Sequence, residues 1–299
     1  MSETYPILIV SPDSPIDDEA LGSKPKFWFR RDGQHWLFKE ARENTGEDWA
    51  EKVAAEIAHR LDISAAEVEL AEYKGRRGSA LRSFVATKRG EELIHGNEIL
   101  AGQVLGYDPN KRFRQNDHTL ENIHKAIGKM FPSPATNLVI LRQLASYLVL
   151  DALIGNTDRH HENWGLLFHF ETQKEEMVIS LRVAPSFDHA SSLGRELNDA
   201  GRTRMLAENR VSRYVRKGRG GVYLSETDGH GANPLALVEF GVRHFPQYFS
   251  PPLENLHRLT LQALQETVDR MPAERMTEPA KAFARAMLAY TYECLCNLK

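Results

Sequence analysis

The sequence lacks the features of secreted, disulfide-bonded and membrane-spanning proteins. Only two of its 299 residues are cysteine, Cys294 and Cys296, so disulfides cannot hold the fold and a reducing compartment is expected. The longest apolar run, residues 144–154, is interrupted by Ser146 and Asp151 and is too short to cross a bilayer. The N-terminus has neither the basic start nor the apolar stretch of a signal peptide. We therefore expect a cytoplasmic protein with no membrane contact.

An excess of charge of one sign is also missing. The formal net charge is -3, so no overall field attracts the chain to nucleic acid, and we expect no direct nucleic-acid binding. The basic run at residues 213–219 is interpreted as a solvated face, with contact to nucleic acid or an acidic substrate as the alternative. The 41% of hydrophobic residues is typical of a folded globular protein.

Several familiar site motifs are absent. The sequence contains no G-x-G-x-x-G and no Walker A motif, which excludes a glycine-rich nucleotide loop of either kind. His160, His161 and Glu162 follow one another, but adjacent histidines do not comfortably face one ion, and no H-E-x-x-H or cysteine set accompanies them. These absences disfavour a zinc hydrolase.

The first third of the chain has the pattern of strands around one helix. Residues 26–31 and 34–39 are aromatic-rich runs separated by Asp-Gly, which predicts a tight hairpin. Apolar residues at every fourth position predict a helix over residues 47–61. Residues 66–73 and 80–87 predict a second hairpin.

Helical patterns dominate from about residue 89. We expect an α+β chain with a small β-rich N-lobe, residues 1–88, and a larger, mostly helical C-lobe, residues 89–299. In the C-lobe the apolar spacing predicts two short strands, at residues 164–170 and 177–183, and helices at residues 120–130, 137–154, 252–270 and 278–298.

A polar loop after the long apolar helix carries the most informative residues. Asp158 and Asn163 lie five positions apart. Phosphoryl transfer needs a carboxylate that accepts the proton of the attacking hydroxyl and an oxygen ligand for Mg²⁺, and this spacing supplies both. Asp188 would add a second oxygen ligand. Alternatively, Asp158 and Asn163 only stabilise a turn, but their agreement with Asp188 and the preceding helix favours a catalytic loop.

The N-lobe offers candidates for the nucleotide site. Lys39 ends a predicted strand and Glu51 follows on a helix, the arrangement by which kinases hold the α- and β-phosphates. Alternatively, Lys39 is a solvated lysine and Glu51 a helix N-terminal acid; Glu56 competes for the partner role. The loop containing Gly22 and Ser23 could cover the phosphates, with an ordinary solvated loop as the alternative.

These residues together resemble the HipA-like serine/threonine kinases, which are distantly similar to the phosphatidylinositol kinases. The resemblance rests on Lys39, Glu51, residues 156–163 and residues 187–193, and it covers about residues 21–214. It implies a bilobal protein-kinase-like fold that uses ATP and Mg²⁺. Its residue assignments are Asp158 as catalytic base, Asn163 and Asp188 as Mg²⁺ ligands, Lys39 as phosphate anchor, and Phe84, Val85 and Ala86 in the hinge that contacts adenine.

The resemblance also bears on regulation. Relatives are controlled by autophosphorylation in the loop that corresponds to Ser23, so phosphorylation of Ser23 would repel the ATP phosphates; alternatively, Ser23 only supports a turn. The chain resembles the short form without an extra β-rich N-terminal subdomain, for which we expect an antitoxin or accessory protein as partner. His189 and Ala190 follow Asp188 where many protein kinases have Phe-Gly, which disfavours their usual activation switch.

The leading hypothesis is a Mg-ATP-dependent kinase that phosphorylates a protein on serine or threonine, as the toxin of a toxin–antitoxin pair. A kinase for a small molecule or a lipid head group is the first alternative. The second alternative is a nucleotide-binding pseudokinase that acts as an interaction module. The pseudokinase is disfavoured because Lys39, Asp158, Asn163 and Asp188 are all present.

Overall fold

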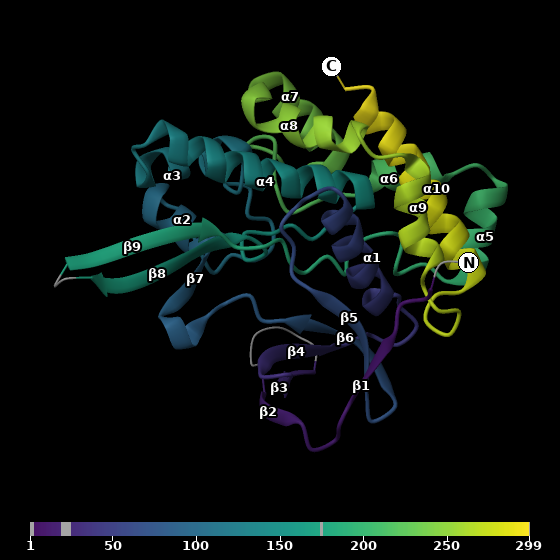
Figure 1. Ribbon diagram of the computed structural model, residues 1–299. Helices are drawn as coiled ribbons and strands as arrows, with labels where there is room; N and C mark the ends of the chain where they lie inside the picture. The colour runs from purple at the N-terminus through teal and green to yellow at the C-terminus, as the bar shows by residue number, and fades with distance from the viewer. Residues whose placement is uncertain (1–2, 19–24, 174–175, 299) are drawn as a thin grey trace.

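A six-stranded sheet forms the N-lobe in the computed structural model, which describes residues 3–18, 25–173 and 176–298. The strand order is β1-β5-β6-β4-β3-β2, and only the β1–β5 pair among the described strands of this sheet is parallel. Figure 1 shows this sheet below the helices of the C-lobe. The strands are β1 (Ile7–Val10), β2 (Pro15–Asp18), β3 (Lys26–Arg31), β4 (Gln34–Glu40), β5 (Val68–Tyr73) and β6 (Arg76–Arg82).

The two N-lobe hairpins test the turn predictions. The β3–β4 hairpin is confirmed, and Asp32 and Gly33 turn the chain with φ of 52° and 74°. The second hairpin exists with a different turn, because Gly75 at φ 75° closes the loop and Tyr73 pairs with Arg76. The predicted second strand, residues 80–87, was therefore wrong in its bounds: β6 begins and ends earlier, and residues 83–86 follow it as a connecting segment.

Helix α1 (Glu47–Arg60) lies between the N-lobe sheet and the C-lobe, as Figure 1 shows. The predicted apolar stripe is confirmed, since Trp49, Val53 and Ile57 are buried. Glu51 is also fully buried on this helix. A buried carboxylate needs a specific partner, so α1 has a role beyond packing.

A second, three-stranded antiparallel sheet lies in the C-lobe, with strand order β7-β8-β9. Its strands are β7 (Glu91–His95), β8 (Gly165–Gln173) and β9 (Glu176–Val183), and a 3-10 turn, η1 (Thr87–Arg89), precedes β7. The β8–β9 hairpin projects from the body of the protein (Figure 1). The lobe boundary predicted between residues 88 and 89 falls within η1, between the two sheets.

Helix α4 (Pro134–Ile154) is the core helix of the C-lobe and contacts α7, α8 and α10. Among the described residues it is the one helix long and apolar enough to span a membrane by length and composition, but it is largely buried by its neighbours. The other helices are α2 (Gly96–Gln103), α3 (Leu120–Met130), α5 (Asp199–Ala207), α6 (Val211–Lys217), α7 (Pro234–His244), α8 (Pro246–His257), α9 (Leu261–Asp269) and α10 (Glu278–Cys296).

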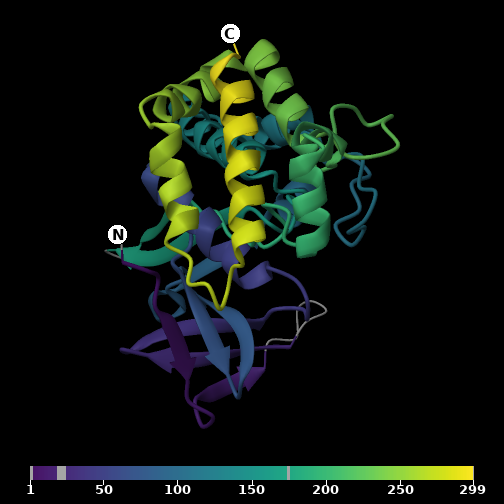
Figure 2. The same cartoon turned by 90° about the vertical axis from the view of Figure 1, so that its right-hand side faces the viewer.

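The single helix predicted over residues 252–270 was wrong. The structure has α8 and α9 there, because the Thr260 hydroxyl accepts a hydrogen bond from the backbone N–H of Ala263 and starts a new helix. The loop after α9 reaches toward the N-lobe, as Figure 2 shows. Arg275 on this loop pairs with Asp48 and Glu72, each at 3.2 Å, and so ties the C-lobe to α1 and β5.

Candidate active site

The loop predicted to be catalytic, residues 156–163, is held against the end of α4. The helix ends at Gly155, which has a φ of 65° and allows a sharp exit. Asn156 then folds back onto the helix: its side-chain nitrogen donates to Asp151 Oδ1 at 2.8 Å, and its side-chain oxygen accepts from the Asp158 backbone N–H at 3.1 Å. Asp158 itself is exposed. The loop therefore presents a carboxylate to solvent from a rigid base.

Asp158 and Asn163 are brought together by a direct contact. The Asn163 side-chain nitrogen donates to the Asp158 backbone carbonyl at 2.6 Å. This bond uses the amide nitrogen and leaves the amide oxygen as the group that can bind a ligand. Asn163 is buried, so its side chain is fixed in position. The five-residue spacing thus forms one compact turn with two different oxygen groups.

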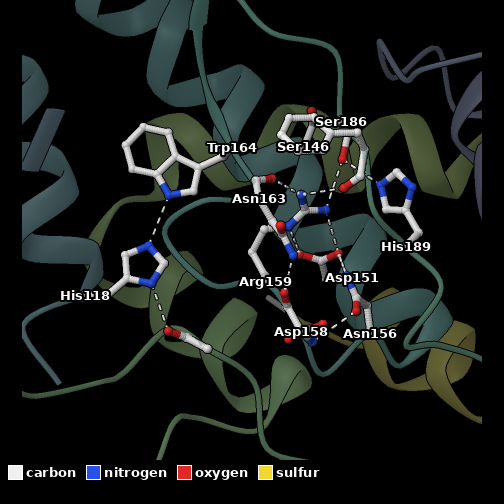
Figure 3. A network of polar contacts seen from close by, with 12 residues as sticks. His118, Ser146, Asp151, Asn156, Asp158, Arg159, Asn163, Trp164, Ser186 and His189 are labelled. Carbon is white, nitrogen blue, oxygen red and sulfur yellow. Dashed lines mark hydrogen bonds and ion pairs between the residues drawn. The ribbon is translucent and has the colours of Figure 1, made fainter. Parts of the chain in front are cut away.

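Arg159 is the centre of a buried polar network (Figure 3). Its guanidinium forms a bidentate pair with Asp151 at 2.7 and 2.8 Å. It also donates to the backbone carbonyl of Asn163 at 2.6 Å and to the hydroxyl of Ser186 at 2.9 Å, and it lies 3.5 Å from the backbone carbonyl of Phe187. The Arg159 side chain therefore joins the end of α4, the loop of residues 156–163 and the segment that carries Asp188.

Asp188 has a strained backbone. Its φ is 62°, a left-handed conformation that residues other than glycine rarely adopt. Such strain persists where surrounding contacts enforce it, and it is concentrated at functional sites. The Asp188 carboxylate lies 3.1 Å from Lys39 Nζ on β4. The two residues are 149 positions apart, so this contact joins the two lobes at the site.

The residue after Asp188 connects this segment to α1. The His189 backbone N–H donates to Glu51 Oε1 at 2.8 Å, and His189 Nδ1 lies 3.5 Å from the same oxygen. Ser186 Oγ accepts from Arg159 at 2.9 Å and lies 2.7 Å from His189 Nε2. Glu51 is therefore linked to Arg159 through His189 and Ser186.

The charges of Lys39 and Glu51 shift each other's pKa. Burial acts to lower the pKa of Lys39, but the charges of Asp188 and Glu51 outweigh burial and raise it. Burial likewise acts to raise the pKa of Glu51, but the hydrogen bond from His189 and the charge of Lys39 lower it. Within the described part of the chain, Glu51 Oε2 has no hydrogen-bond partner. The direct contact of Lys39 is with Asp188, and Glu51 acts on it through charge.

The competing helix glutamate faces a different partner. Glu56 pairs with Lys52 at 2.7 Å, and Lys52 also donates to the backbone carbonyl of Val68. Of the two glutamates considered for the site, Glu51 is therefore the one whose charge acts on Lys39. Gly22 and Ser23 lie outside the described residues.

The predicted hinge is tied to the C-lobe sheet. Arg182 on β9 donates to the Phe84 backbone carbonyl at 2.9 Å and pairs with Glu91 at 3.0 Å. Glu91 accepts from the Ala86 backbone N–H at 2.8 Å. The Phe84 ring also lies 5.4 Å, centroid to centroid, from Phe187, beside Asp188. Phe84 and Ala86 are therefore held by side chains of the C-lobe; Val85 lies between them and accepts from the Ser83 hydroxyl.

The histidines near the loop are structural. His118 accepts from the Trp164 indole at 3.1 Å and contacts the Gly221 carbonyl at 2.8 Å, and burial lowers its pKa to about 3. Burial lowers the pKa of His160 to about 4, and His161 lies 2.8 Å from the Tyr107 hydroxyl. No group of three or more His, Cys, Asp or Glu side chains within the described residues could hold a metal.

A Mg²⁺ ion would need a different donor set, and the residues present fit one. Magnesium prefers oxygen ligands and usually takes few of them from the protein. The Asp188 carboxylate and the Asn163 amide oxygen are such donors. Arg159 contacts the backbone of Asn163 and of Phe187, the neighbour of Asp188, so it holds both donor segments around one guanidinium.

Sequence reasoning missed the four residues of the supporting network. Asp151 was visible as a charge within an apolar helix, and a buried charge requires a partner. The identity of that partner depends on how the loop folds back, which no local pattern encodes. The missed residues are Asp151, Arg159, Ser186 and His189.

Comparison with known proteins bears on the fold. A comparison with curated protein sequences found no match. Among solved structures, the proinflammatory kinase CtkA of Helicobacter pylori is similar, with a TM-score of 0.73, 20% identity, and 92% of this chain and 91% of that chain covered. HipA of Shewanella oneidensis MR-1, solved with HipB and operator DNA, has a TM-score of 0.56 at 12% identity, with 98% of this chain and 66% of that chain covered.

These similarities establish the fold, which is α+β and bilobal with a β-rich N-lobe and a helical C-lobe, as predicted. A family model described as the HipA-like C-terminal domain matches residues 19–233, most of the chain. This chain therefore belongs to the HipA-like C-terminal domain family and has the fold of a HipA-like kinase.

Proposed function

We propose that the protein is a Mg-ATP-dependent kinase that phosphorylates serine or threonine residues of a protein substrate. The observation that carries this proposal is the contact of Lys39 with Asp188 beside the Asp158–Asn163 turn. This arrangement brings together residues from separate parts of the chain. They are the Lys39 cation for phosphate, the Asn163 and Asp188 oxygens for Mg²⁺, and the exposed Asp158 carboxylate. Phosphoryl transfer depends on such positioning and charge stabilisation.

The nucleotide would lie between the lobes. Lys39, oriented by the charge of Glu51, would hold its phosphates, and the backbone of Phe84, Val85 and Ala86 would contact the adenine. Asn163 and Asp188 would hold Mg²⁺, which neutralises charge that develops on the phosphoryl oxygens. Gly22 and Ser23 are proposed to cover the phosphates, with phosphorylation of Ser23 as an inhibitory modification.

Asp158 is the proposed catalytic base. Its carboxylate accepts the proton of the acceptor hydroxyl as the hydroxyl oxygen bonds to the γ-phosphorus of ATP. The bond between that phosphorus and the bridging oxygen of ADP breaks in the same step. The Ser191 hydroxyl lies 3.5 Å from Asp158 Oδ2 and helps to orient the carboxylate.

We further propose an antitoxin or accessory protein as partner. The support is family membership and the HipA structure, which comes from a toxin–antitoxin system and contains HipB. The toxin role is part of this proposal. A reducing cytoplasm is the proposed compartment, because both cysteines are free thiols.

The direct test is incubation of the protein with labelled ATP, Mg²⁺ and a cell extract, beside an Asp158→Asn control. Label on serine or threonine of a protein, lost in the control, supports the proposal. Label on a small molecule or lipid instead would favour the alternative kinase hypotheses. Binding of ATP without any transfer would indicate a pseudokinase.

A further inference from the structure

A large pocket adjoins the catalytic loop on the side of the C-lobe helices. It has a volume of about 710 Å³, within the usual range for ligand sites. Its walls come from α6, α10, the start of α7 and residues 191–197. Every residue that lines it belongs to the C-lobe, so it is distinct from the nucleotide site around Lys39.

Two residues of the pocket wall adjoin Asp158, the proposed catalytic base. Thr157 and Ser191 form part of its wall. Thr157 precedes Asp158 in the chain and donates its backbone N–H to the Ser191 carbonyl at 3.1 Å, while the Ser191 hydroxyl contacts the Asp158 carboxylate at 3.5 Å. A peptide bound in the pocket would therefore lie next to residues that adjoin Asp158.

The lining is strongly cationic. Glu196 is its one carboxylate among the described lining residues, and it accepts a hydrogen bond from the Tyr214 hydroxyl. The whole chain has a net charge of -3, so the cationic lining is a local concentration rather than a consequence of overall composition. The positively charged lining residues are Arg195, Arg210, Arg213, Lys217 and Arg219.

The partners of these cations divide them into two groups. Arg195 is neutralised by Glu47 at 2.7 Å and Arg210 by Glu208 at 2.6 Å. Arg219 donates to three backbone carbonyls around the end of α6 and keeps its net charge. Arg213 and Lys217, both on α6, form no ion pair within residues 3–18, 25–173 and 176–298.

An ordinary solvated face would explain exposed cations on a helix, but these two line a hollow. Apolar side chains form other parts of its wall, among them Leu197, Met205 and Met287. A concave surface that combines apolar walls with unneutralised cations suits an extended acidic peptide, which offers carboxylates and aliphatic stems together. The net charge of -3 provides no wider positive field for a nucleic-acid backbone.

We propose that this pocket binds acidic residues next to the acceptor serine or threonine, and that Arg213 and Lys217 select acidic protein substrates. The proposal rests on the proposed protein kinase function and adds the substrate class. Opposite charges in a partly exposed pocket give specificity and faster association. The basic run at residues 213–219, interpreted from sequence as a solvated face, thereby acquires a role.

The test uses the whole protein, Mg-ATP and a degenerate peptide library with a central serine or threonine. We expect wild-type protein to favour peptides with Asp or Glu beside the acceptor. Arg213→Gln and Lys217→Gln should each lower kcat/KM for the best acidic peptide by roughly two- to fivefold, the range of partly exposed charge pairs. The double Arg213→Glu, Lys217→Glu variant should shift the preference toward neutral or basic peptides.

The matched control is Arg204→Gln, which removes an exposed cation of α5 that does not line the pocket. It should leave the ratio of kcat/KM for acidic and neutral peptides unchanged, and thermal unfolding should show that every variant is folded. Equal kcat/KM for acidic and neutral peptides in the wild type would overturn the inference and leave the kinase function standing. If added RNA inhibited peptide labelling and the wild type showed no preference among peptides, the pocket would be assigned to nucleic acid. That result would also overturn the inference. Absence of transfer to any peptide would overturn the proposed protein kinase function itself.

Discussion

Replacement of Arg159 by methionine separates stability from catalytic positioning. Arg159 and Asp151 have side chains that are 4% and 3% exposed, so their ion pair is shielded from water. Removing one partner of a buried pair leaves an uncompensated charge and costs about 3–5 kcal/mol. We expect the free energy of unfolding of Arg159→Met, measured by urea denaturation, to fall by this amount.

The double variant Asp151→Leu, Arg159→Met distinguishes the two roles. Replacing both members of a buried pair by apolar residues is often close to neutral, but Asp151→Leu also removes the acceptor of the Asn156 side chain, so only part of the lost stability should return. The phosphorylation rate should not return, because Asn163, Phe187 and Ser186 still lack their common donor. A displacement of about 1 Å at a catalytic group can cost roughly a hundredfold in rate, and we expect kcat to be reduced on that scale.

The assays are urea denaturation and steady-state phosphorylation at saturating Mg-ATP, on the wild type, the single variant and the double variant. Recovery of both stability and kcat in the double variant would refute the positioning role of Arg159. A loss of less than about 1 kcal/mol in the single variant would refute the claim that the pair is effectively buried.

Three further outcomes are expected. Asp158→Asn should lower the rate of phosphoryl transfer by about 10²- to 10⁴-fold with Mg-ATP affinity retained; near wild-type transfer would remove Asp158 from the role of base. Asp188→Ala should weaken Mg-ATP binding in calorimetry, because an oxygen donor is lost and the charge of Lys39 is left without its direct partner; equal affinities would make Asp188 structural. His118 has its pKa lowered by burial from 6.5 to about 3, so between these pH values the unfolded state binds its proton and the folded state does not. The contribution of His118 to the free energy of unfolding is therefore complete above pH 6.5 and falls by about 1.4 kcal/mol per pH unit on acidification toward pH 3. His118→Gln should make the free energy of unfolding, measured with urea, depend less steeply on pH. The same pH dependence in both proteins would contradict a buried neutral imidazole at His118.

Features set by neighbouring residues were predictable from the chain. Asp-Gly between aromatic runs located the β3–β4 hairpin, and four-residue apolar spacing located α1. Asp158 and Asn163 are close in sequence, so their spacing was enough to predict that one loop presents both. Turn chemistry and helical periodicity act over a few residues, which is why these predictions needed no tertiary information.

The partners of the charged groups at the site were decided only by tertiary packing. Lys39 contacts Asp188 across 149 positions, and Glu51 accepts from His189 across 138. No periodicity specifies such pairs, since they depend on how α1 and the Asp188 segment meet between the lobes. The split of residues 252–270 into α8 and α9 also escaped prediction, because one hydroxyl at Thr260 restarted the helix within a continuous apolar pattern. The cationic pocket has the same origin: its residues are ordinary surface cations in the sequence, and only the packing of α6 beside the catalytic loop and α10 gathers them around one hollow.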